Sequence, residues 1–567
     1  MDATRGNQQL MGYTGTVYMH LGLITSASVN SGDWRYSPTT WGTTTAPVAT
    51  SLGNNKWSFT INNPRAYFNS AGGGVPVGES ILRIAILFRN GPGDLAQRNA
   101  GGGDMYIPIY PAGGNHMQFT QPFIQPFYNI SHEAITASVN QQVPVTAVAS
   151  TASGTLNLYF NGVLIAGPLT GVSTITGNPT INTSGNQQII SELVIGGASY
   201  YDTVQFYLAP PNTIQSLPPG VREGINYWPG CDSVTLVLYA PNKQNSVVLG
   251  DFPNNNWVSQ TQFLMNKTPD GNYYWITLHG LTPGIEYSFE YLVDNSIYIA
   301  DPYSEKVLDP WNDQYIPAST YPGLKSYPVS PNVLAGTNGI VSVLQTCATP
   351  YNWQVTNFVK PDQRNLVTYE LLVRDFGSAH NYQMLIDTIS YFKRLGINAI
   401  ELMPVSEFSG NDSWGYNPEF YLALDKAYGT KDKFKEFIDL CHKNGIAVIL
   451  DVVYNQLDAF NAPEGKLYWD AANNKPATNN PWLNPDAPHP YSVFNDLNHT
   501  SAATQYWVSR ALEYWITEYK VDGYRFDLAK GFTQTPSDNT TVENYDQSRV
   551  DNLKRYYDSI IPKYPGT

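Results

Sequence analysis

The stretch VDGYRFDLAKGF, residues 521–532, decides how the C-terminal half of the chain folds. In an extended strand, successive side chains leave opposite faces, so Arg525 and Asp527 share one face while Tyr524 and Phe526 share the other. A guanidinium beside a carboxylate keeps that carboxylate ionised, which is the state that a nucleophilic carboxylate requires. The alternative is a structural ion pair that closes a strand, and the residues around this stretch must decide between the two.

Three earlier stretches have the same strand-like composition, and helical patterns separate them. They are LVTYELLVRDF (366–376), INAIELMPV (397–405) and IAVILDVVYN (446–455). Apolar residues at helical spacing lie between them, and this alternation predicts parallel βα units. The connection at 454–500, after the third strand, is long for a compact domain, which indicates a site or a small subdomain.

The first 325 residues have a different pattern, with short β-like runs separated by turn-rich gaps. We predict a β-sandwich that could bind glucan at 1–111, an immunoglobulin-like spacer at 112–210 and a third β-sandwich at 211–325. Trp34, Trp41 and Trp57 could present flat faces to sugar rings, although filling a core is the commoner role of tryptophan. The expected fold class is multidomain: β-sandwich modules followed by a partial (β/α)8 barrel at 326–567.

Composition narrows the classes of partner. The net charge of -14 and the pI near 5.0 disfavour nucleic acid, and 567 residues are too many for one ordinary core. Three cysteines permit at most one disulfide; Cys441 falls on an apolar helical stripe and is predicted as core, while a bridge from Cys231 to Cys347 stays open. No apolar run reaches membrane-spanning length, and we expect no membrane span.

Four segments, in order, resemble conserved segments of the α-amylase family, glycoside hydrolase family 13. They are SWGYNP (413–418), DVVYN (451–455), FNDLN (494–498) and GYRFDLAKG (523–531). The resemblance implies that Asp527 is the nucleophile of a retaining glycosidase, that Arg525 orients it and that Asp451 supports the arginine. It also implies that Tyr416, Trp414, Lys530 and Gln456 contact the sugar.

The resemblance further implies a calcium site. Asn455 and Asp496 match the family's calcium ligands, and amide and carboxylate oxygens suit that hard cation. One departure concerns Gln456, which stands where the family usually has histidine; glutamine can still donate a hydrogen bond to a hydroxymethyl group of the substrate but cannot become cationic.

A second departure concerns the extent of the barrel. A complete (β/α)8 barrel has eight strands, whereas four are predicted here, and the family's general-acid glutamate matches no residue of the chain. We therefore expect a fragment of a longer reading frame, truncated at both ends and inactive by itself. The opening residues MDATRGNQQLMGYTG lack the pattern of a signal peptide, and we expect a secreted or cell-surface parent whose first residues are missing.

The leading hypothesis is a starch-like α-glucan hydrolase that cleaves α-1,4 bonds with retention. A debranching or branching enzyme of the same family is the alternative among enzymes. A non-catalytic starch-binding protein is the alternative from another class.

Overall fold

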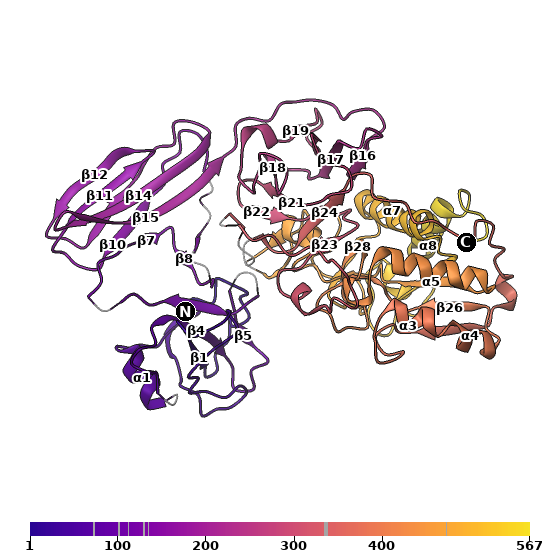
Figure 1. Cartoon of the computed structure of the whole chain (residues 1–567), viewed down its shortest axis with the longest axis horizontal. Coiled ribbons are helices and arrows are strands. Elements are labelled where there is room, and N and C mark those ends of the chain that lie inside the picture. Colours follow the sequence, from indigo (N-terminus) through magenta and orange to yellow (C-terminus); the bar gives the residue numbers. More distant parts are fainter. Residues whose placement is uncertain are drawn as a thin grey trace.

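The computed structural model is described for residues 1–71, 74–99, 102–111, 113–128, 131–133, 135, 137–330, 332–333, 338–471 and 473–567. Figure 1 shows three β-rich modules followed by a region of alternating strands and helices. The chain order of the modules follows the predicted order, and no described helix is both long and apolar enough to cross a membrane.

The first module is built on one antiparallel sheet. Its central strand β4 (Ile81–Arg89) pairs with β1 (Tyr18–Thr25), β5 (Ala96–Gln97) and β6 (Met105–Pro108). A hairpin, β2 (Thr50–Gly53) and β3 (Lys56–Ser58), and a short helix, α1 (Pro64–Ala71), complete it. Trp57 is buried in the core of this module, whereas the side chain of Trp41 is exposed.

The second module has two sheets that share one apolar core. The first sheet contains β7 (Met117–Gln121), β10 (Val145–Ala149) and β13 (Thr174–Gly177); the second contains β11 (Thr155–Phe160), β12 (Val163–Thr170), β14 (Gly185–Ile195) and β15 (Ala198–Leu208). The short pair β8 (Ile124–Gln125) and β9 (Ser131–His132) lies outside both sheets. The space between the two sheets is filled by apolar side chains, because alternate residues of each strand point inward. They include Phe119, Val145, Leu158 and Leu193.

The third module also has two antiparallel sheets. One has the order β16 (Gly224–Tyr227), β17 (Ser233–Tyr239), β20 (Tyr273–His279) and β19 (Asn266–Lys267); the other contains β18 (Ser246–Gly250), β21 (Glu286–Val293), β22 (Ile297–Ile299), β24 (Val341–Gln345) and β23 (Val307–Leu308). Trp275 is buried, as expected for a core residue.

The predicted boundary at residue 325 is too early. β24 pairs with both β21 and β23, so the sheet of the third module continues to Gln345. A disulfide between Cys231 and Cys347, with Cα atoms 5.4 Å apart, then joins the start of the module to its end. The proline- and glycine-rich stretch looked like a linker because the returning strand is only a few residues long.

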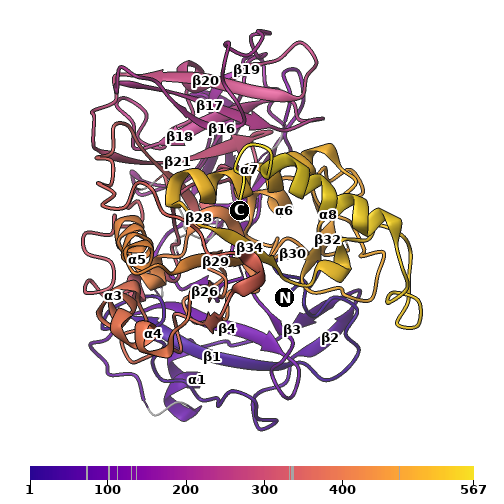
Figure 2. The ribbon, with the colours of Figure 1, turned by 90° about the vertical axis from the view of Figure 1, so that its right-hand side faces the viewer.

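The C-terminal region holds a four-stranded parallel sheet. Its order is β25 (Thr368–Leu371), β26 (Ala399–Leu402), β29 (Ala447–Val452) and β34 (Gly523–Phe526), which confirms the four predicted strands and their parallel pairing. The connecting helices are α3 (Tyr382–Asp387), α4 (Ile389–Leu395), α5 (Lys431–Lys443) and α7 (Ala502–Tyr519), with α8 (Gln547–Ile560) after the last strand. Figure 2 shows β26, β29 and β34 side by side among these helices.

Helix α5 shows how local sequence sets these elements. The hydroxyl of Thr430 accepts a hydrogen bond from the backbone N–H of Lys433, which satisfies one of the free donors at the helix start. Phe434, Phe437 and Cys441 then recur at helical spacing and are fully buried, so the prediction that Cys441 is a core thiol is confirmed.

The long connections carry small elements that shape one end of the sheet. After β26 come the hairpin β27 (Ser406–Phe408) and β28 (Pro418–Leu424) and the single turn η4 (Lys426–Tyr428). Within 454–500 lie β30 (Gln456–Leu457), α6 (Pro463–Leu467), β31 (Trp469–Asp470), β32 (Lys475–Pro476) and β33 (Asn495–Asp496). After β34 comes η5 (Ala529–Phe532), and the loop before β24 contains η2 (Asp313–Tyr315).

Candidate active site

Asp451 and Arg525 meet at the carboxyl end of the parallel sheet. They are direct partners in the register of β29 and β34, so their side chains leave the same face of the sheet. The backbone N–H of Asp527 still donates to the carbonyl of Val452 at 2.9 Å, which carries Asp527 into the same row just past the strand end. Carboxyl ends of parallel strands are where functional residues collect in α/β folds.

One guanidinium nitrogen joins both carboxylates. Arg525 Nη1 lies 3.0 Å from each carboxylate oxygen of Asp451 and 2.5 Å from Oδ1 of Asp527. The side chain of Asp451 is fully buried, whereas that of Asp527 retains some exposure. Asp527 therefore has one oxygen held by the arginine and is reachable from solvent.

Tyr416 contacts this cluster from the loop between β27 and β28. Its hydroxyl donates to Oδ2 of Asp451 at 2.8 Å, and the ring is half-buried. The preceding Gly415 has φ +88° and packs so closely that a Cβ would lie 2.8 Å from the carbonyl oxygen of Pro404. A side chain at Gly415 would push the loop away, so glycine lets Tyr416 reach the sheet.

Burial and charge act in opposite directions on this cluster. Burial raises the pKa of Asp451 to about 6, although the hydrogen bonds from Tyr416 and Arg525 oppose the rise. The pKa of Arg525 is raised because its contacts with Asp527 and Asp451 outweigh the burial that would lower it. Asp451 therefore gains a proton as the pH falls through about 6.

Gln456 does not have the role that the sequence indicated. We expected its amide to donate to the substrate, but the side chain is buried; its Nε2 donates to the carbonyl of Tyr416 at 2.9 Å, and its Oε1 accepts from Asn455 at 2.9 Å. The loop that carries Tyr416 takes one of the two N–H donors of Gln456, and the side chain is only 2% exposed. Gln456 thus holds the backbone of Tyr416 in place.

The two other predicted sugar contacts lie on the surface. The Trp414 side chain is exposed, two residues before Tyr416 on the same loop. Lys530 is exposed in η5, and its Nζ pairs with both carboxylate oxygens of Glu543 at 2.7 and 2.6 Å. A substrate contact by Lys530 stays a prediction, and it would require the lysine to exchange Glu543 for a sugar hydroxyl.

Two contacts around the cluster were missed in the sequence. Glu401, interpreted as structural, has its Oε1 4.0 Å from Nε of Arg525, and burial raises the pKa of Glu401. Arg374, just after β25, donates to Asp412 at 2.9 Å and so ties the Tyr416 loop to the first strand. The signal for Glu401 was its place one residue from the end of β26, which pairs with β29, the strand of Asp451.

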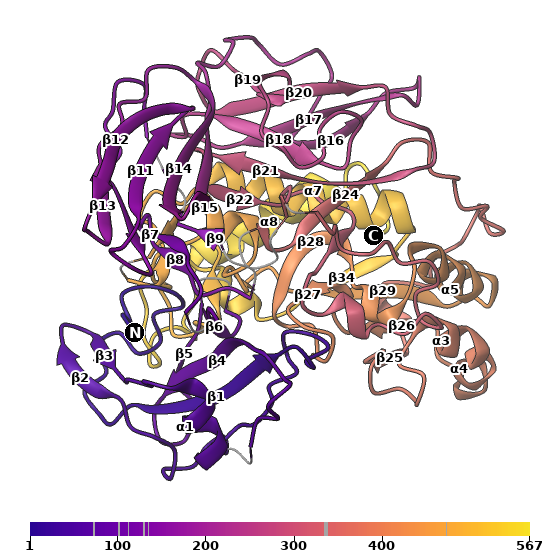
Figure 3. The ribbon, with the colours of Figure 1, turned by 60° about the vertical axis from the view of Figure 1, so that its left-hand side comes forward.

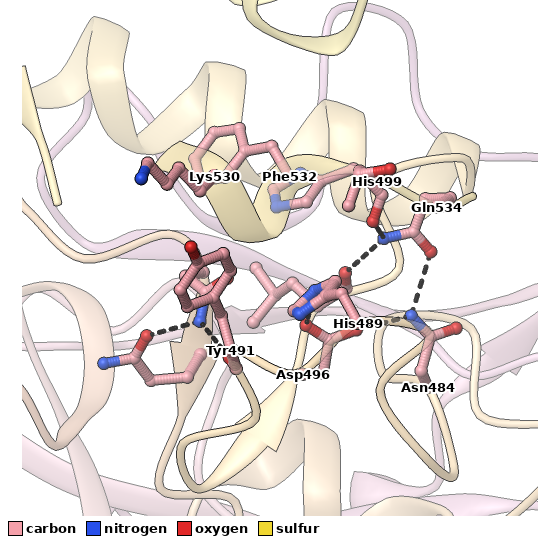
Figure 4. Close-up of polar contacts among 12 residues, drawn as sticks. Asn484, His489, Tyr491, Asp496, His499, Lys530, Phe532 and Gln534 are labelled. Carbon is pink, nitrogen blue, oxygen red and sulfur yellow. Dashed lines mark hydrogen bonds and ion pairs between the residues drawn. The ribbon is translucent and has the colours of Figure 1, made fainter. Parts of the chain in front are cut away.

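The predicted metal ligands lie together beneath η5. Figure 4 shows Asp496 beside His489 and Asn484, with Lys530 and Phe532 above them. Asn455 and Asp496 are buried, and Oδ1 of each has no hydrogen-bond partner in the described part of the chain. His489 Nε2 lies 3.0 Å from Oδ1 of Asp496.

The backbone closes over this group of polar atoms. A Cβ on Gly531 would lie 1.7 Å from Oδ1 of Asn455 and 3.0 Å from a ring carbon of His489, so the chain can pass only as glycine. His499, by contrast, is structural, because its two ring nitrogens bond the hydroxyl of Tyr556 and the carbonyl of Tyr454. Among the residues that the structure describes, no three His, Cys, Asp or Glu side chains gather as a metal site.

We predict that Asp451→Asn slows chemistry at Asp527 by about 10- to 100-fold, because Arg525 then loses the group that fixes its direction. In the wild type, protonation of Asp451 as the pH falls through about 6 removes the same ion pair, so the rate should fall below that pH. Both effects are measured by the pH dependence of the rate at which a glycosyl fluoride labels Asp527 covalently. An Asp451→Asn rate that still shows the wild-type fall near pH 6 would contradict this assignment.

Comparison with known proteins adds to this geometry. The family model described as α-amylase, catalytic domain, matches residues 378–489. The malto-oligosyltrehalose trehalohydrolase of Saccharolobus solfataricus is 30% identical over 297 residues, which are 52% of this chain and 44% of that protein. A 1,4-α-glucan branching enzyme from Chlamydia trachomatis is 26% identical over 355 residues, 59% of this chain and 43% of the relative.

A solved pullulanase structure from Bacillus subtilis, complexed with maltose, aligns with a TM-score of 0.45 and 20% identity over 76% of this chain and 59% of that one. The chain spans less than half the length of the two curated relatives.

Proposed function

Because the chain belongs to the α-amylase family, glycoside hydrolase family 13, we propose that it supplies the nucleophile of a retaining hydrolase acting on α-1,4 bonds of a starch-like glucan. The observation that carries the proposal is the contact of one arginine with both carboxylates, Asp451 and Asp527, at the carboxyl end of the sheet. The four parallel strands would be the first four of a (β/α)8 barrel.

In the proposed reaction, a carboxylate oxygen of Asp527 attacks the anomeric carbon of the bound sugar. The C–O bond to the leaving sugar breaks, its electron pair stays on the leaving oxygen, and a proton must reach that oxygen. Arg525 holds Asp527 and Asp451 in one row. The hydroxyl of Tyr416 donates to Asp451, and the ring of Tyr416 can stack beneath the sugar. Water then releases the glycosyl group from Asp527.

The test uses a leaving group that needs no proton. Retaining hydrolysis requires a second carboxyl group, as acid, about 5 Å from the nucleophile, and we assign that role to no described residue. Fluoride departs without protonation, so a 5-fluoro-maltosyl fluoride should transfer its sugar to Asp527 of the full chain and raise its intact mass by one glycosyl group. Absence of any adduct after prolonged incubation would refute the proposal.

A branching or debranching activity is the second candidate. The branching enzyme among the relatives favours it, as does the β-sandwich preceding the parallel sheet, and both activities would use the same nucleophile. Linkage analysis of the products from maltosyl fluoride with amylose as acceptor separates branching from hydrolysis: new α-1,6 bonds indicate branching, and new α-1,4 bonds or free maltose do not. Debranching is separated by whether a branched glucan is cut at its α-1,6 bonds or at its α-1,4 bonds.

We propose calcium as the ion for the cluster around Asn455. The two buried oxygens without hydrogen-bond partners, Asn455 Oδ1 and Asp496 Oδ1, fit a hard cation, whereas the nearby imidazole of His489 is not a usual calcium ligand. The ion, when bound, would tie the start of the 454–500 connection, at Asn455, to its end, at Asp496. Gln456, which follows Asn455, holds the backbone of Tyr416.

Calcium should therefore stabilise the C-terminal region by about 2–3 kcal/mol at a hundredfold excess over its dissociation constant. Thermal unfolding with calcium and with a chelator measures this, and Asp496→Asn should abolish the difference. An equal calcium shift in Asp496→Asn and wild type would place the ion elsewhere.

We also propose that the protein acts outside the cytoplasm, either secreted or at the cell surface. The disulfide between Cys231 and Cys347 supports this, because such bonds persist in oxidising compartments. The check is to unfold protein recovered from the culture medium and to count the thiols that can be alkylated. One thiol, that of Cys441, is expected, because the other two cysteines form the disulfide.

A further inference from the structure

A cleft of about 910 Å³ lies where the second module, the third module and the 454–500 connection meet. Figure 3 shows β15 of the second module beside β22 of the third. The volume of the cleft is at the upper end of the ~300–1,000 Å³ that small-molecule sites occupy. None of Asp451, Arg525, Asp527 or Tyr416 lines it, so it is separate from the candidate active site.

One wall of the cleft is aromatic. Trp311, from the loop before β24, and Phe460 and Trp469, from the 454–500 connection, are partly exposed there. The rings of Phe460 and Trp469 meet edge to face with centroids 6.3 Å apart. Flat rings whose faces are left partly open are the groups on which sugar rings stack.

The part of the cleft formed by the second module carries amides. Gln188 on β14 and Gln205 on β15 are direct cross-strand partners, and Asn186 lies two residues away on the same face as Gln188. These three side chains make no hydrogen bond within the described part of the chain. Each amide offers both donors and acceptors, which is what neighbouring sugar hydroxyls need.

The charged groups of the cleft already have partners. Glu133 pairs with Arg5, His132 lies 3.2 Å from a carboxylate oxygen of Asp202, and Nζ of Lys466 donates to the carbonyl of Asn338 at 3.2 Å. Burial lowers the pKa of Lys466 to about 8, which weakens its charge further near that pH. Among the described residues that line the cleft, a charged ligand would therefore find no unpaired side chain of opposite charge, whereas a neutral ligand needs none.

We propose that this cleft binds a second stretch of neutral α-glucan, stacked on Trp311 and Trp469 and hydrogen-bonded by Gln188 and Gln205. The choice of α-glucan as the polymer rests on the proposed function. Phe460 and Trp469 belong to the same connection as Gln456, which holds the backbone of Tyr416. The cleft and the support of Tyr416 therefore share the 454–500 connection.

The experiment is calorimetric titration of the full 567-residue chain with maltoheptaose. Wild type should bind two molecules per chain. Trp311→Ala with Trp469→Ala should weaken one of the two sites by about tenfold or more, as expected for stacked tryptophans. Gln188→Ala with Gln205→Ala, two changes on the surface of a sheet, should weaken the same site several-fold and leave folding intact.

Trp228→Ala is the matched control, because Trp228 is an exposed tryptophan of the third module that does not line the cleft. It should bind as wild type does, and Tyr416→Ala should weaken only the other site. Unchanged binding in both cleft double variants, or one site in wild type that is lost with Tyr416→Ala, overturns the proposal. So does a cleft that prefers cellohexaose, or no binding by wild type.

These outcomes separate the cleft from the proposed function. If the cleft variants lose one site but the fluoride label at Asp527 is absent, the cleft proposal stands and the nucleophile assignment fails. If the label forms at Asp527 in the cleft variants at the wild-type rate and their binding of maltoheptaose is unchanged, the nucleophile assignment stands and the cleft proposal fails.

Discussion

We expect Asp527→Asn to abolish covalent labelling by a glycosyl fluoride, with a fall in rate of about 10³-fold or more. The amide of asparagine carries no negative charge and cannot form a stable ester with the anomeric carbon. The geometry makes Asp527 the candidate, because Asp451 is buried against Arg525 and Tyr416 while Asp527 is held through one oxygen and keeps access to solvent.

Peptide mapping of the labelled wild type identifies the modified residue directly. The adduct should map to the peptide containing Asp527 and to neither Glu401 nor Asp451, the other two carboxylates near Arg525. Asp558→Asn, a change to an exposed carboxylate on α8 that pairs with Lys554, is the matched control and should label as wild type does. A persistent adduct in Asp527→Asn would move the nucleophile to another residue.

The largest expected effect on stability comes from Lys426→Met. Lys426 is 2% exposed; its Nζ contacts Glu407 on β27 and lies 3.3 Å from Oδ1 of Asp313 in η2. Removing the cation leaves two buried carboxylates without their partner, which costs about 3–5 kcal/mol. Lys426 joins the η2 loop of the third module to the parallel-sheet region, so its loss should weaken the contact between these two parts of the chain.

The sign of the pH dependence gives a second readout. Burial raises the pKa of Glu407 well above its usual value, and a carboxyl whose folded pKa is raised binds more protons in the folded state. Stability from this group therefore falls as the pH rises, and the loss caused by Lys426→Met should be smaller at pH 5 than at pH 8.

Urea unfolding at both pH values measures the effect of Lys426→Met. Lys554→Met, which breaks an exposed pair with Asp558, should change stability by less than about 1 kcal/mol. Equal losses from the two variants, or a loss at Lys426 that does not depend on pH, would contradict a buried ionic link.

Short patterns predicted the elements that depend on neighbouring residues. The four parallel strands lie within the four predicted stretches. The shared face of Arg525 and Asp527 also follows from period two alone. These features need no knowledge of the remaining chain, since they are properties of one strand.

Features that depend on pairing between distant segments were missed. The return of β24 to the third module requires partners in β21 and β23, both far earlier in the chain, and no local pattern carries that information. The burial of Gln456 under the Tyr416 loop and the 4.0 Å contact of Glu401 with Arg525 are of the same kind.

By itself, the sequence determined the strand that leads into Asp527, the order of the βα units and the resemblance to the α-amylase family, because side-chain periodicity and short motifs are encoded in consecutive residues. Only the tertiary structure decided that Arg525 lies between two carboxylates, that Gln456 supports Tyr416 and that an aromatic wall faces the amides of the second module. Those arrangements depend on strand register and on packing between modules, and both are set by contacts that sequence-distant residues make in the folded chain.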